Sequence, residues 1–298
     1  MTDNGELDQV LGLKITMNHD TGIATISQTA YIDGMLRRFG LEEANPVDTP
    51  MTVALQGIGP RTEGQAPATM VAEFASIIGS AMWAGMGTRP DIIYAVCRLG
   101  RFMANPREEH LAGAKRILRY LKGTSTIGLV YTAERLVQLE GFTDADHAKD
   151  PSTRRSVSGY AFFVHGNLVS WRSRLQATVA ISSTESEYMA MSEASREAKW
   201  LRTLTTELGL APRRATDIYT DSSGAYSLAR NPEGHNRLKH INTHYHFVRE
   251  LVASQQVSIT QIGTDDNAAD VFTKVTGIDR LHDSMLQLGL GDNRRADA

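Results

Sequence analysis

The order of strand-like and helix-like segments in the second half of the chain restricts its fold more than any other feature. Val, Ile, Tyr and Phe are concentrated in "IGLVYTA", "RLVQLEGFTDAD", "VSGYAFFVHGNLVSWRS" and "ATVAISS", and "VHGNL" is a hairpin signal. A long helical segment (184–210) follows, then the strand "TDIYT", a helix at 223–229, the strand "VSITQIG" and a short helix holding "AADVFTK". This order predicts an α/β fold, with a mixed five-stranded sheet and flanking helices.

The first 122 residues predict a different, mainly helical region. Apolar residues alternate in "LGLKIT" and in "GIATI", with a turn at "NHDTG" between them, which indicates a β-hairpin. A short helix is expected from Tyr31 to about Phe39, followed by a Pro- and Gly-rich loop. From Val71 to Lys122 apolar residues recur at helical spacing, so a small helical unit should precede the sheet.

Composition restricts the setting of the protein. The chain has 298 residues, 41% of them hydrophobic, which is enough for a normal core and two domains. Cys97 is its single cysteine, so no disulfide can form within the chain and a reduced, intracellular setting is expected, in cytoplasm or nucleus. We find no stretch that approaches the ~20 apolar residues of a membrane span, and the polar start "MTDNGELDQV" is unlike a signal peptide. No membrane association is therefore expected.

Charge is unevenly distributed along the chain. The formal net charge is −3, yet residues 88–123 hold eight Lys or Arg against three acids. That local excess suits a polyanionic partner, and a solvated basic helix face is the alternative.

Two segments of the predicted sheet end in the same way. "LEGFTDADHA" and "DIYTDSSGA" each place an aspartate, Asp144 or Asp221, at the end of an apolar strand. If these strands pair in parallel through a right-handed crossover, their ends meet at one edge of the sheet. Glu185, in the first turn of the crossover helix, and Asp270, in the last short helix, fall at matching places.

Such a carboxylate quartet would need cations. Clustered carboxylates repel, and hard oxygen ligands suit Mg²⁺ or Mn²⁺. Two such ions roughly 4 Å apart serve in-line displacement at phosphorus. The alternative is that Glu185 is favoured at a helix start by the helix dipole, and that Asp144 and Asp221 merely end strands.

Several motifs resemble one known family. "TDAD", "RRSVSGY", "SSTESEY" and "EAKWLR", followed by "YTDSSGAYSLARNP", "RLKHINTHYHFVRE" and "AADVFTK", resemble in this order the ribonuclease H domain of copia-type LTR retrotransposon Pol polyproteins. Upstream, "QTAYIDGMLRRFGLEEANPVDTPM" is similar to the end of the reverse transcriptase palm, and "GTRPDIIYAVCRLGRFMANPREEHLAGAKRILRYLKGT" to the thumb and connection. The resemblance divides the chain into a palm remnant (1–50), a thumb/connection-like helical region (51–132), a ribonuclease H-like domain (133–276) and a C-terminal helix and tail (277–298).

The resemblance implies a nuclease and its site. The family's acids fall on Asp144, Glu185, Asp221 and Asp270, which would hold two Mg²⁺ or Mn²⁺ ions and hydrolyse the RNA strand of an RNA–DNA hybrid. Asp146 and Glu187 would be secondary, with Glu187 completing a helix cap at Thr184. The family's polymerase aspartates fall upstream of these residues, so no polymerase activity is expected from this fragment. The alternatives are a hybrid-binding remnant that does not cut, and part of a reverse transcriptase completed by a missing palm.

Other residues are candidates for substrate contact. Arg154, Arg155 and Ser156 resemble a place where a nucleic-acid backbone is gripped, a solvated turn being the alternative. Trp171 and Trp200 are expected in the core rather than stacked on bases. Four histidines raise the question of zinc, but structural or phosphate-contacting roles are preferred, with His235 as a helper in product release; the four are His235, His240, His244 and His246.

The chain departs from the family pattern at three places. His147 stands where the family usually has Trp, "QIGTDDNAAD" replaces a more glutamate-rich segment before Asp270, and "FTKVT" lacks a proline. The second departure changes the loop that carries Asp270.

Overall fold

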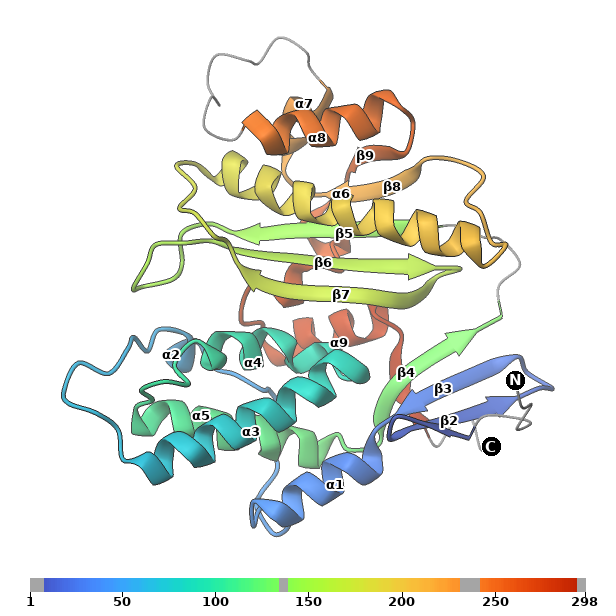
Figure 1. Ribbon diagram of the computed structural model, residues 1–298. Coiled ribbons are helices and arrows are strands. Elements are labelled where there is room, and N and C mark those ends of the chain that lie inside the picture. Colours follow the sequence, from blue (N-terminus) through green and yellow to red (C-terminus); the bar gives the residue numbers. More distant parts are fainter. Residues whose placement is uncertain (1–7, 134–138, 231–241, 294–298) are drawn as a thin grey trace. The chain divides into compact units, whose positions relative to one another are not determined.

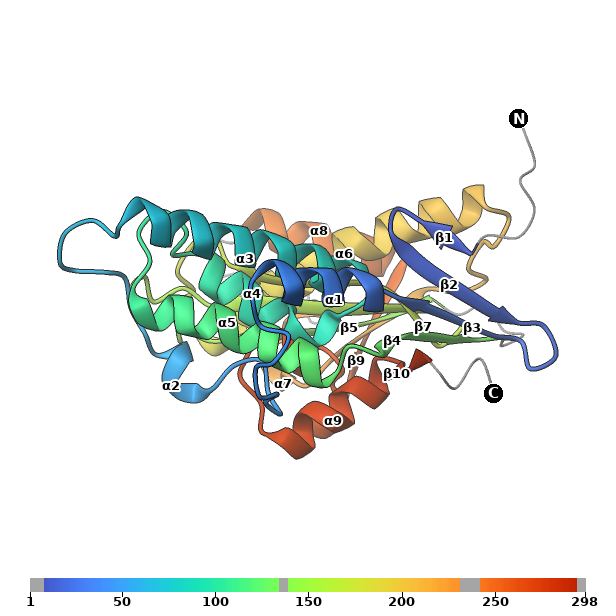
Figure 2. The same ribbon diagram turned by 90° about the horizontal axis from the view of Figure 1, so that it is seen from below.

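The computed structural model describes residues 8–133, 139–230 and 242–293. It divides into two compact units. Unit 1 comprises residues 1–133 and 275–298, and unit 2 comprises residues 134–274. Figures 1 and 2 label most of the helices and strands of both units as they are named below.

Unit 1 contains a five-stranded antiparallel sheet. Its order is β1-β2-β3-β4-β10, built from β1 (Gln9–Val10), β2 (Leu13–Asn18), β3 (Ile23–Ser27), β4 (Ile127–Thr132) and β10 (Leu290–Asp292). The predicted hairpin is confirmed as β2–β3, and its turn is held by Asn18, whose Oδ1 accepts hydrogen bonds from the backbone N–H groups of Asp20 and Thr21. Residues near both ends of the chain therefore share one sheet.

Strand β4 lies in the segment "IGLVYTA", which was predicted as a strand. It pairs with β3 and β10 of unit 1. Its composition indicates a strand, and the pairing partners of a strand are decided by tertiary contacts.

The helices of unit 1 confirm the predicted helical region. They are α1 (Thr29–Arg38), α2 (Val53–Gln56), α3 (Ala68–Gly87), η1 (Pro90–Ile92), α4 (Ile93–Gly100), α5 (Glu108–Gly123) and α9 (Ile278–Gln287). Helices α3, α4 and α5 lie side by side, as Figures 1 and 2 show. Their facing side chains form the core, among them Phe74, Ile77, Val96, Leu99 and Ile117.

Helix α3 contradicts the expectation that no segment is long and apolar enough to span a membrane. By length and composition it is apolar enough to do so. A core helix passes the same test, and six α3 residues are buried in unit 1, namely Phe74, Ile77, Ile78, Ala81, Ala84 and Gly85. We therefore describe α3 as a core helix of unit 1.

The basic residues of unit 1 largely brace its own loops. Arg98 is buried and donates to the carbonyl oxygens of Gln56 and Ile58, while Arg119 donates to the carbonyl oxygen of Asn45. Arg116 donates to the Thr49 hydroxyl, and Lys115 pairs with Glu73. The local excess of positive charge therefore gives weak support to a nucleic-acid surface, because several of these groups are already bonded within the unit.

Unit 2 contains a mixed five-stranded sheet of order β7-β6-β5-β8-β9. Strands β5 (Leu139–Asp146), β6 (Val157–Val164) and β7 (Asn167–Leu175) are antiparallel, whereas β8 (Thr216–Thr220) is parallel to β5 and β9 (Val257–Gln261) is parallel to β8. The predicted mixed five-stranded sheet with flanking helices is confirmed. The segment "ATVAISS", predicted as a strand, contains no strand residues and instead leads into the next helix.

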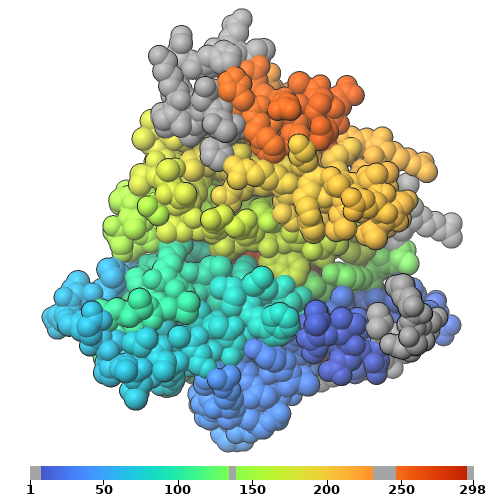
Figure 3. All heavy atoms as spheres, in the orientation of Figure 1, coloured from blue at the N-terminus to red at the C-terminus, as the bar shows by residue number. Residues whose placement is uncertain are grey.

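The helices of unit 2 are α6 (Ser183–Glu207), α7 (Ser223–Arg230) and α8 (Asn242–Ala253), with the short η4 (Thr264–Asp266) and η5 (Asp270–Phe272). Helix α6 crosses one face of the sheet (Figure 1), and its buried stripe forms one core with β8, β9, α7 and α8. Trp200, on α6, was expected in this core but is 56% exposed. Figure 3 shows the segment of α6 at the surface, in yellow. Trp171, on edge strand β7, is half-buried.

Candidate active site

Parallel pairing brings the two strand-end aspartates together. In the β5–β8 ladder Phe142 is opposite Tyr219. Asp144 and Asp221 each lie two residues further along, so they reach the same edge of the sheet on neighbouring strands. The convergence expected for Asp144 and Asp221 is therefore found in the structure.

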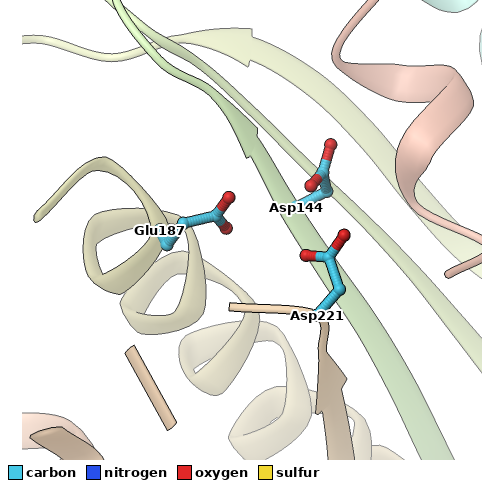
Figure 4. Close-up of side chains that lie close together, drawn as sticks. All are labelled: Asp144, Glu187 and Asp221. Atoms are coloured by element: carbon cyan, nitrogen blue, oxygen red, sulfur yellow. The ribbon is translucent and has the colours of Figure 1, made fainter. Parts of the chain in front are cut away.

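The third acid of the cluster is Glu187 of helix α6. One carboxylate oxygen from each of Asp144, Glu187 and Asp221 lies within 4.8 Å of the other two, and Figure 4 shows the three side chains pointing toward one another. Asp144 is buried, and the other two are partly buried. Three oxygen donors thus converge from two strands and one helix.

Glu185, expected in this position, instead lies in the cap of α6. The hydroxyl of the N-cap residue Ser182 accepts a hydrogen bond from the Glu185 backbone N–H at 3.1 Å, and the Glu185 Oε2 accepts one from the Ile181 N–H at 2.8 Å. The Ser182 hydroxyl therefore caps α6, and the Glu185 carboxylate reaches back to the residue before the cap. The prediction that Thr184 caps the helix with Glu187 is wrong, because α6 begins two residues earlier.

The sequence does not distinguish the two glutamates. Ser182 with Glu185 and Thr184 with Glu187 both fit the capping pattern, so the cap alone cannot decide between them. Burial does not decide either, because Glu185 is 1% exposed and Glu187 is partly buried. The choice depends on where α6 begins.

Thr273 connects Asp270 to Asp144 by hydrogen bonds. The Thr273 hydroxyl donates to Asp144 Oδ2 and also to the Asp270 carbonyl oxygen at 3.0 Å. Lys274 forms an ion pair with the Asp270 carboxylate. Asp270 is 3% exposed and raises the pKa of Asp144, although its carboxylate is outside the group of three that converges within 4.8 Å.

A glycine allows η5 to approach the sheet closely. Gly159 on β6 is opposite Asp144, and a Cβ atom built on it would lie 2.8 Å from the Phe272 Cβ and 2.9 Å from the Thr273 Cγ2. Any side chain at position 159 would therefore push η5 away from Asp144. The altered sequence before Asp270 is accommodated by Asn267, whose side chain donates to the Thr143 carbonyl oxygen at 3.1 Å.

The pKa values of Asp144 and Glu187 are raised by burial and by neighbouring acids. Burial, together with Asp270 and Asp221, raises the pKa of Asp144 to about 6, despite the opposing hydrogen bond from Thr273. Burial and the charges of Asp144 and Asp221 raise the pKa of Glu187 to about 9. Negative charge at the site is therefore poorly compensated by the protein, even with Lys274 nearby.

The donor set fits a hard divalent cation. Oxygen ligands from several carboxylates suit Mg²⁺ or Mn²⁺, which would compensate the repulsion. Two buried carboxylate oxygens near the cluster, Glu187 Oε2 and Asp146 Oδ2, have no hydrogen-bond partner among the described residues. The second oxygen of Asp146 pairs with Lys149 at 2.9 Å. Vacant acceptors beside a carboxylate cluster are what a cation site provides.

Three of the four predicted substrate-contacting residues, Arg154, Arg155 and Ser156, lie in the loop between β5 and β6. Ser156 is fully buried and its hydroxyl accepts a hydrogen bond from the Ala148 N–H at 3.0 Å, so it braces the loop. Arg154 is exposed, in a left-handed conformation at φ 57°, and Arg155 is partly buried. The arginines are therefore placed where they could meet a ligand, whereas the Ser156 hydroxyl is turned inward.

The histidine cluster is largely outside the described residues. His235 and His240 lie there, as does the side chain of His244, and His246 is exposed on α8. The roles suggested for these histidines, including product release by His235, stay predictions.

Several known proteins are similar in sequence to this chain. No protein-family model matches it. It is 39% identical over 278 residues to the retrovirus-related Pol polyprotein from transposon TNT 1-94 of Nicotiana tabacum, covering 92% of this chain and 21% of the relative. It is 39% identical over 274 residues to the retrovirus-related Pol polyprotein from transposon RE1 of Arabidopsis thaliana, covering 91% of this chain and 18% of the relative.

The chain thus spans about a fifth of the length of the curated relatives it matches. Among solved structures, LC11-RNase H1 in complex with RNA/DNA hybrid is similar over 46% of this chain and 94% of that one, with a TM-score of 0.34 and 13% identity. The collinear similarity over nine-tenths of the sequence confirms the resemblance seen in its motifs: the chain belongs to the family of retrovirus-related Pol polyproteins of copia-type LTR transposons.

Proposed function

We propose that unit 2 is a metal-dependent ribonuclease H that hydrolyses the RNA strand of RNA–DNA hybrids. The observation that carries the proposal is the convergence of Asp144, Glu187 and Asp221 within 4.8 Å, in a chain of the Pol family whose motifs resemble a ribonuclease H domain. A single cysteine is consistent with an intracellular setting for this reaction.

The role of each residue in the proposed reaction follows from its position in the site. Asp144, Glu187 and Asp221 would hold the divalent cation, and Asp270, beside Asp144, would complete a second position. Bound there, a pair of Mg²⁺ or Mn²⁺ ions supplies an activated water and stabilises the leaving oxygen in displacement at phosphorus. Thr273 orients Asp144 by donating to its Oδ2. Lys274, paired with Asp270, partly compensates the negative charge.

The assignment of Glu187 rather than Glu185 gives the sharpest test. We expect Glu187→Gln to reduce Mg²⁺-dependent cleavage of a labelled hybrid by at least about 100-fold, as loss of a group that stabilises the transition state does. Glu185→Gln is the matched control, because it removes the same charge two residues away on the same helix, and it should retain cleavage.

Each outcome of the test has a distinct meaning. Equal loss in both variants, with both folded by circular dichroism, would contradict the assignment of Glu187. Wild-type protein that binds hybrid but yields no product with Mg²⁺ or Mn²⁺ would contradict the nuclease and support the non-cutting remnant. Primer extension only after addition of a palm would support the completed polymerase.

A further inference from the structure

Four arginines line a cavity along the edge of the unit 2 sheet that is formed by β9. The cavity has a volume of about 780 Å³ and is formed by the second half of α6, the α6–β8 loop, α7, the end of α8 and edge strand β9. Its arginines are Arg202, Arg213, Arg214 and Arg230. It extends along β9 from Val257 to Thr260. Arg213 and Arg214 precede the start of β8, whereas Asp221 follows the end of that strand.

The positive charge in this cavity is poorly compensated. Among the described residues that line it, Asp217 is the one acid. Its Oδ2 lies 3.9 Å from Arg214 Nη2, and its Oδ1 accepts a hydrogen bond from the Ser258 hydroxyl. Four guanidinium groups therefore share one carboxylate that is already hydrogen-bonded elsewhere.

Two of the arginines are held in place by neutral partners. Arg202 is partly buried, and its Nη1 donates to the Arg214 carbonyl oxygen at 2.8 Å and to the Thr216 hydroxyl at 3.0 Å. Burial lowers the pKa of Arg202, and no carboxylate contributes to that shift. Arg230 lies over the Tyr226 ring, 5.4 Å from its centroid, and donates to the Tyr226 hydroxyl. These guanidinium groups are oriented but not neutralised, which favours an anionic ligand.

The cavity continues into a second hollow, which favours an extended ligand. That hollow, of about 540 Å³, shares Arg230 and Val252 with the first and adds one further arginine and one acid of α8, Arg249 and Glu250. We call the two together the arginine trough. Guanidinium forks match phosphate oxygens bidentately, and a row of them suits successive phosphates rather than one small anion.

We propose that the arginine trough binds the phosphate backbone of a nucleic acid, as a second contact remote from the carboxylate cluster. The identity of this ligand rests on the proposed function of unit 2. The five residues of β8 separate Arg213 and Arg214 from Asp221, and they span about 16 Å at 3.3 Å each. That length corresponds to about five base pairs at 3.4 Å per pair, so a longer duplex is needed to touch both.

The test measures binding separately from cleavage. In an Asp144→Asn background, the affinity for a labelled 18-base-pair RNA–DNA hybrid is measured by fluorescence anisotropy at several salt concentrations. We expect Arg213→Ala/Arg214→Ala to weaken binding about tenfold at low salt. The slope of log K against log salt should fall by about 1 to 2, because each phosphate that the protein no longer neutralises lowers it by about one unit.

The matched control is Arg172→Ala/Arg174→Ala. These two arginines are also exposed, but they lie on β7, the opposite edge of the same sheet. The control should change affinity by less than about twofold. Equal weakening in both pairs, or none in either, would overturn the proposal, because the contact would then be general attraction or would not exist.

Two competitors distinguish other occupants. An acidic peptide that binds the wild type more tightly than the hybrid does, and loses that binding in Arg213→Ala/Arg214→Ala, would make the trough a peptide site and overturn the proposal. We expect inorganic phosphate to displace the hybrid only at high ionic strength. Failure of the wild type to cleave would contradict the proposed function without changing these binding differences.

Discussion

Buried charged side chains occur in both units, but in unit 1 they are paired with opposite charges and in unit 2 they meet like charges. In unit 1 the Arg89 guanidinium is fully buried, donates two hydrogen bonds to Asp91, and also donates to the Thr124 hydroxyl and carbonyl oxygen. Tyr120 donates a further hydrogen bond to Asp91 at 2.7 Å. Burial opposes the charge on Arg89, but Asp91 and Tyr120 together outweigh it, so the pKa of Arg89 lies above its usual value.

In unit 2 the charges that meet have the same sign. Asp144, Glu187 and Asp221 repel one another, and the pKa values of Asp144 and Glu187 are raised. In a network of opposite charges, such as that of Arg89 and Asp91, each partner instead favours the charged form of the other. The comparison shows that burial of charge is not in itself a sign of function. A buried ion that is fully bonded stabilises a fold, whereas buried like charges that lack partners indicate a missing ligand.

Breaking the paired network should have the largest effect on stability. Asp91→Asn leaves the Arg89 guanidinium buried without its counter-ion, so we expect unit 1 to lose about 3–5 kcal/mol of unfolding free energy. Chemical denaturation measures this loss. Glu73→Gln is the control, since its pair with Lys115 is partly exposed at 2.7 Å and should contribute less than about 1 kcal/mol. Similar losses in both variants would contradict the distinction.

Adding a cation should stabilise unit 2 and leave unit 1 unchanged. With Mn²⁺ or Mg²⁺ at 100 times its Kd, the gain should be about 2.7 kcal/mol, and EDTA should reverse it. Hydrogen exchange resolves the two units. Glu187→Gln should remove most of this gain; a gain that persists in that variant would place the cation elsewhere.

The metal-free protein should become less stable as pH rises. Because the folded pKa of Glu187 is about 9 and its unfolded value is 4.5, the folded state holds a proton that the unfolded state has lost between these pH values. Stability therefore falls through this window, by at most about 1.4 kcal/mol per pH unit. Since the side chain is only partly buried, we expect a loss of about 2 kcal/mol between pH 5 and pH 8 in EDTA, relative to Glu187→Gln. Parallel pH profiles for the two proteins would contradict the repulsion.

Removing the cap should have the smallest effect. Glu185→Ala removes the acceptor for the Ile181 N–H, so unit 2 should lose about 1 kcal/mol while its cation affinity stays unchanged. Isothermal titration with Mn²⁺ measures the affinity. A tenfold loss of affinity would return Glu185 to the metal site.

The site shows where sequence reasoning succeeds and where it stops. Asp144 and Asp221 could be predicted because strand ends and a parallel crossover follow from local pattern and chain handedness. The choice between Glu185 and Glu187 depended on where α6 begins, and helix ends are the least certain part of a pattern because neighbouring serines and threonines compete for the cap. Trp200 was misjudged for a related reason: its type favours burial, but its position on the outer face of α6 decides.

The sequence by itself determined most of the helices and strands, the mixed sheet of unit 2, the family and the two strand-end aspartates. Each of these depends on periodicity, strand order or motifs along the chain. Only the tertiary structure decided that β4 pairs with β3 and β10, that Glu187 faces the aspartates, and that arginines from α6, the α6–β8 loop and α7 surround one cavity. These depend on which faces and which distant segments meet. That is settled by packing of the whole unit, because local patterns fix the direction of a side chain only after the start of its helix and the partners of its strand are known.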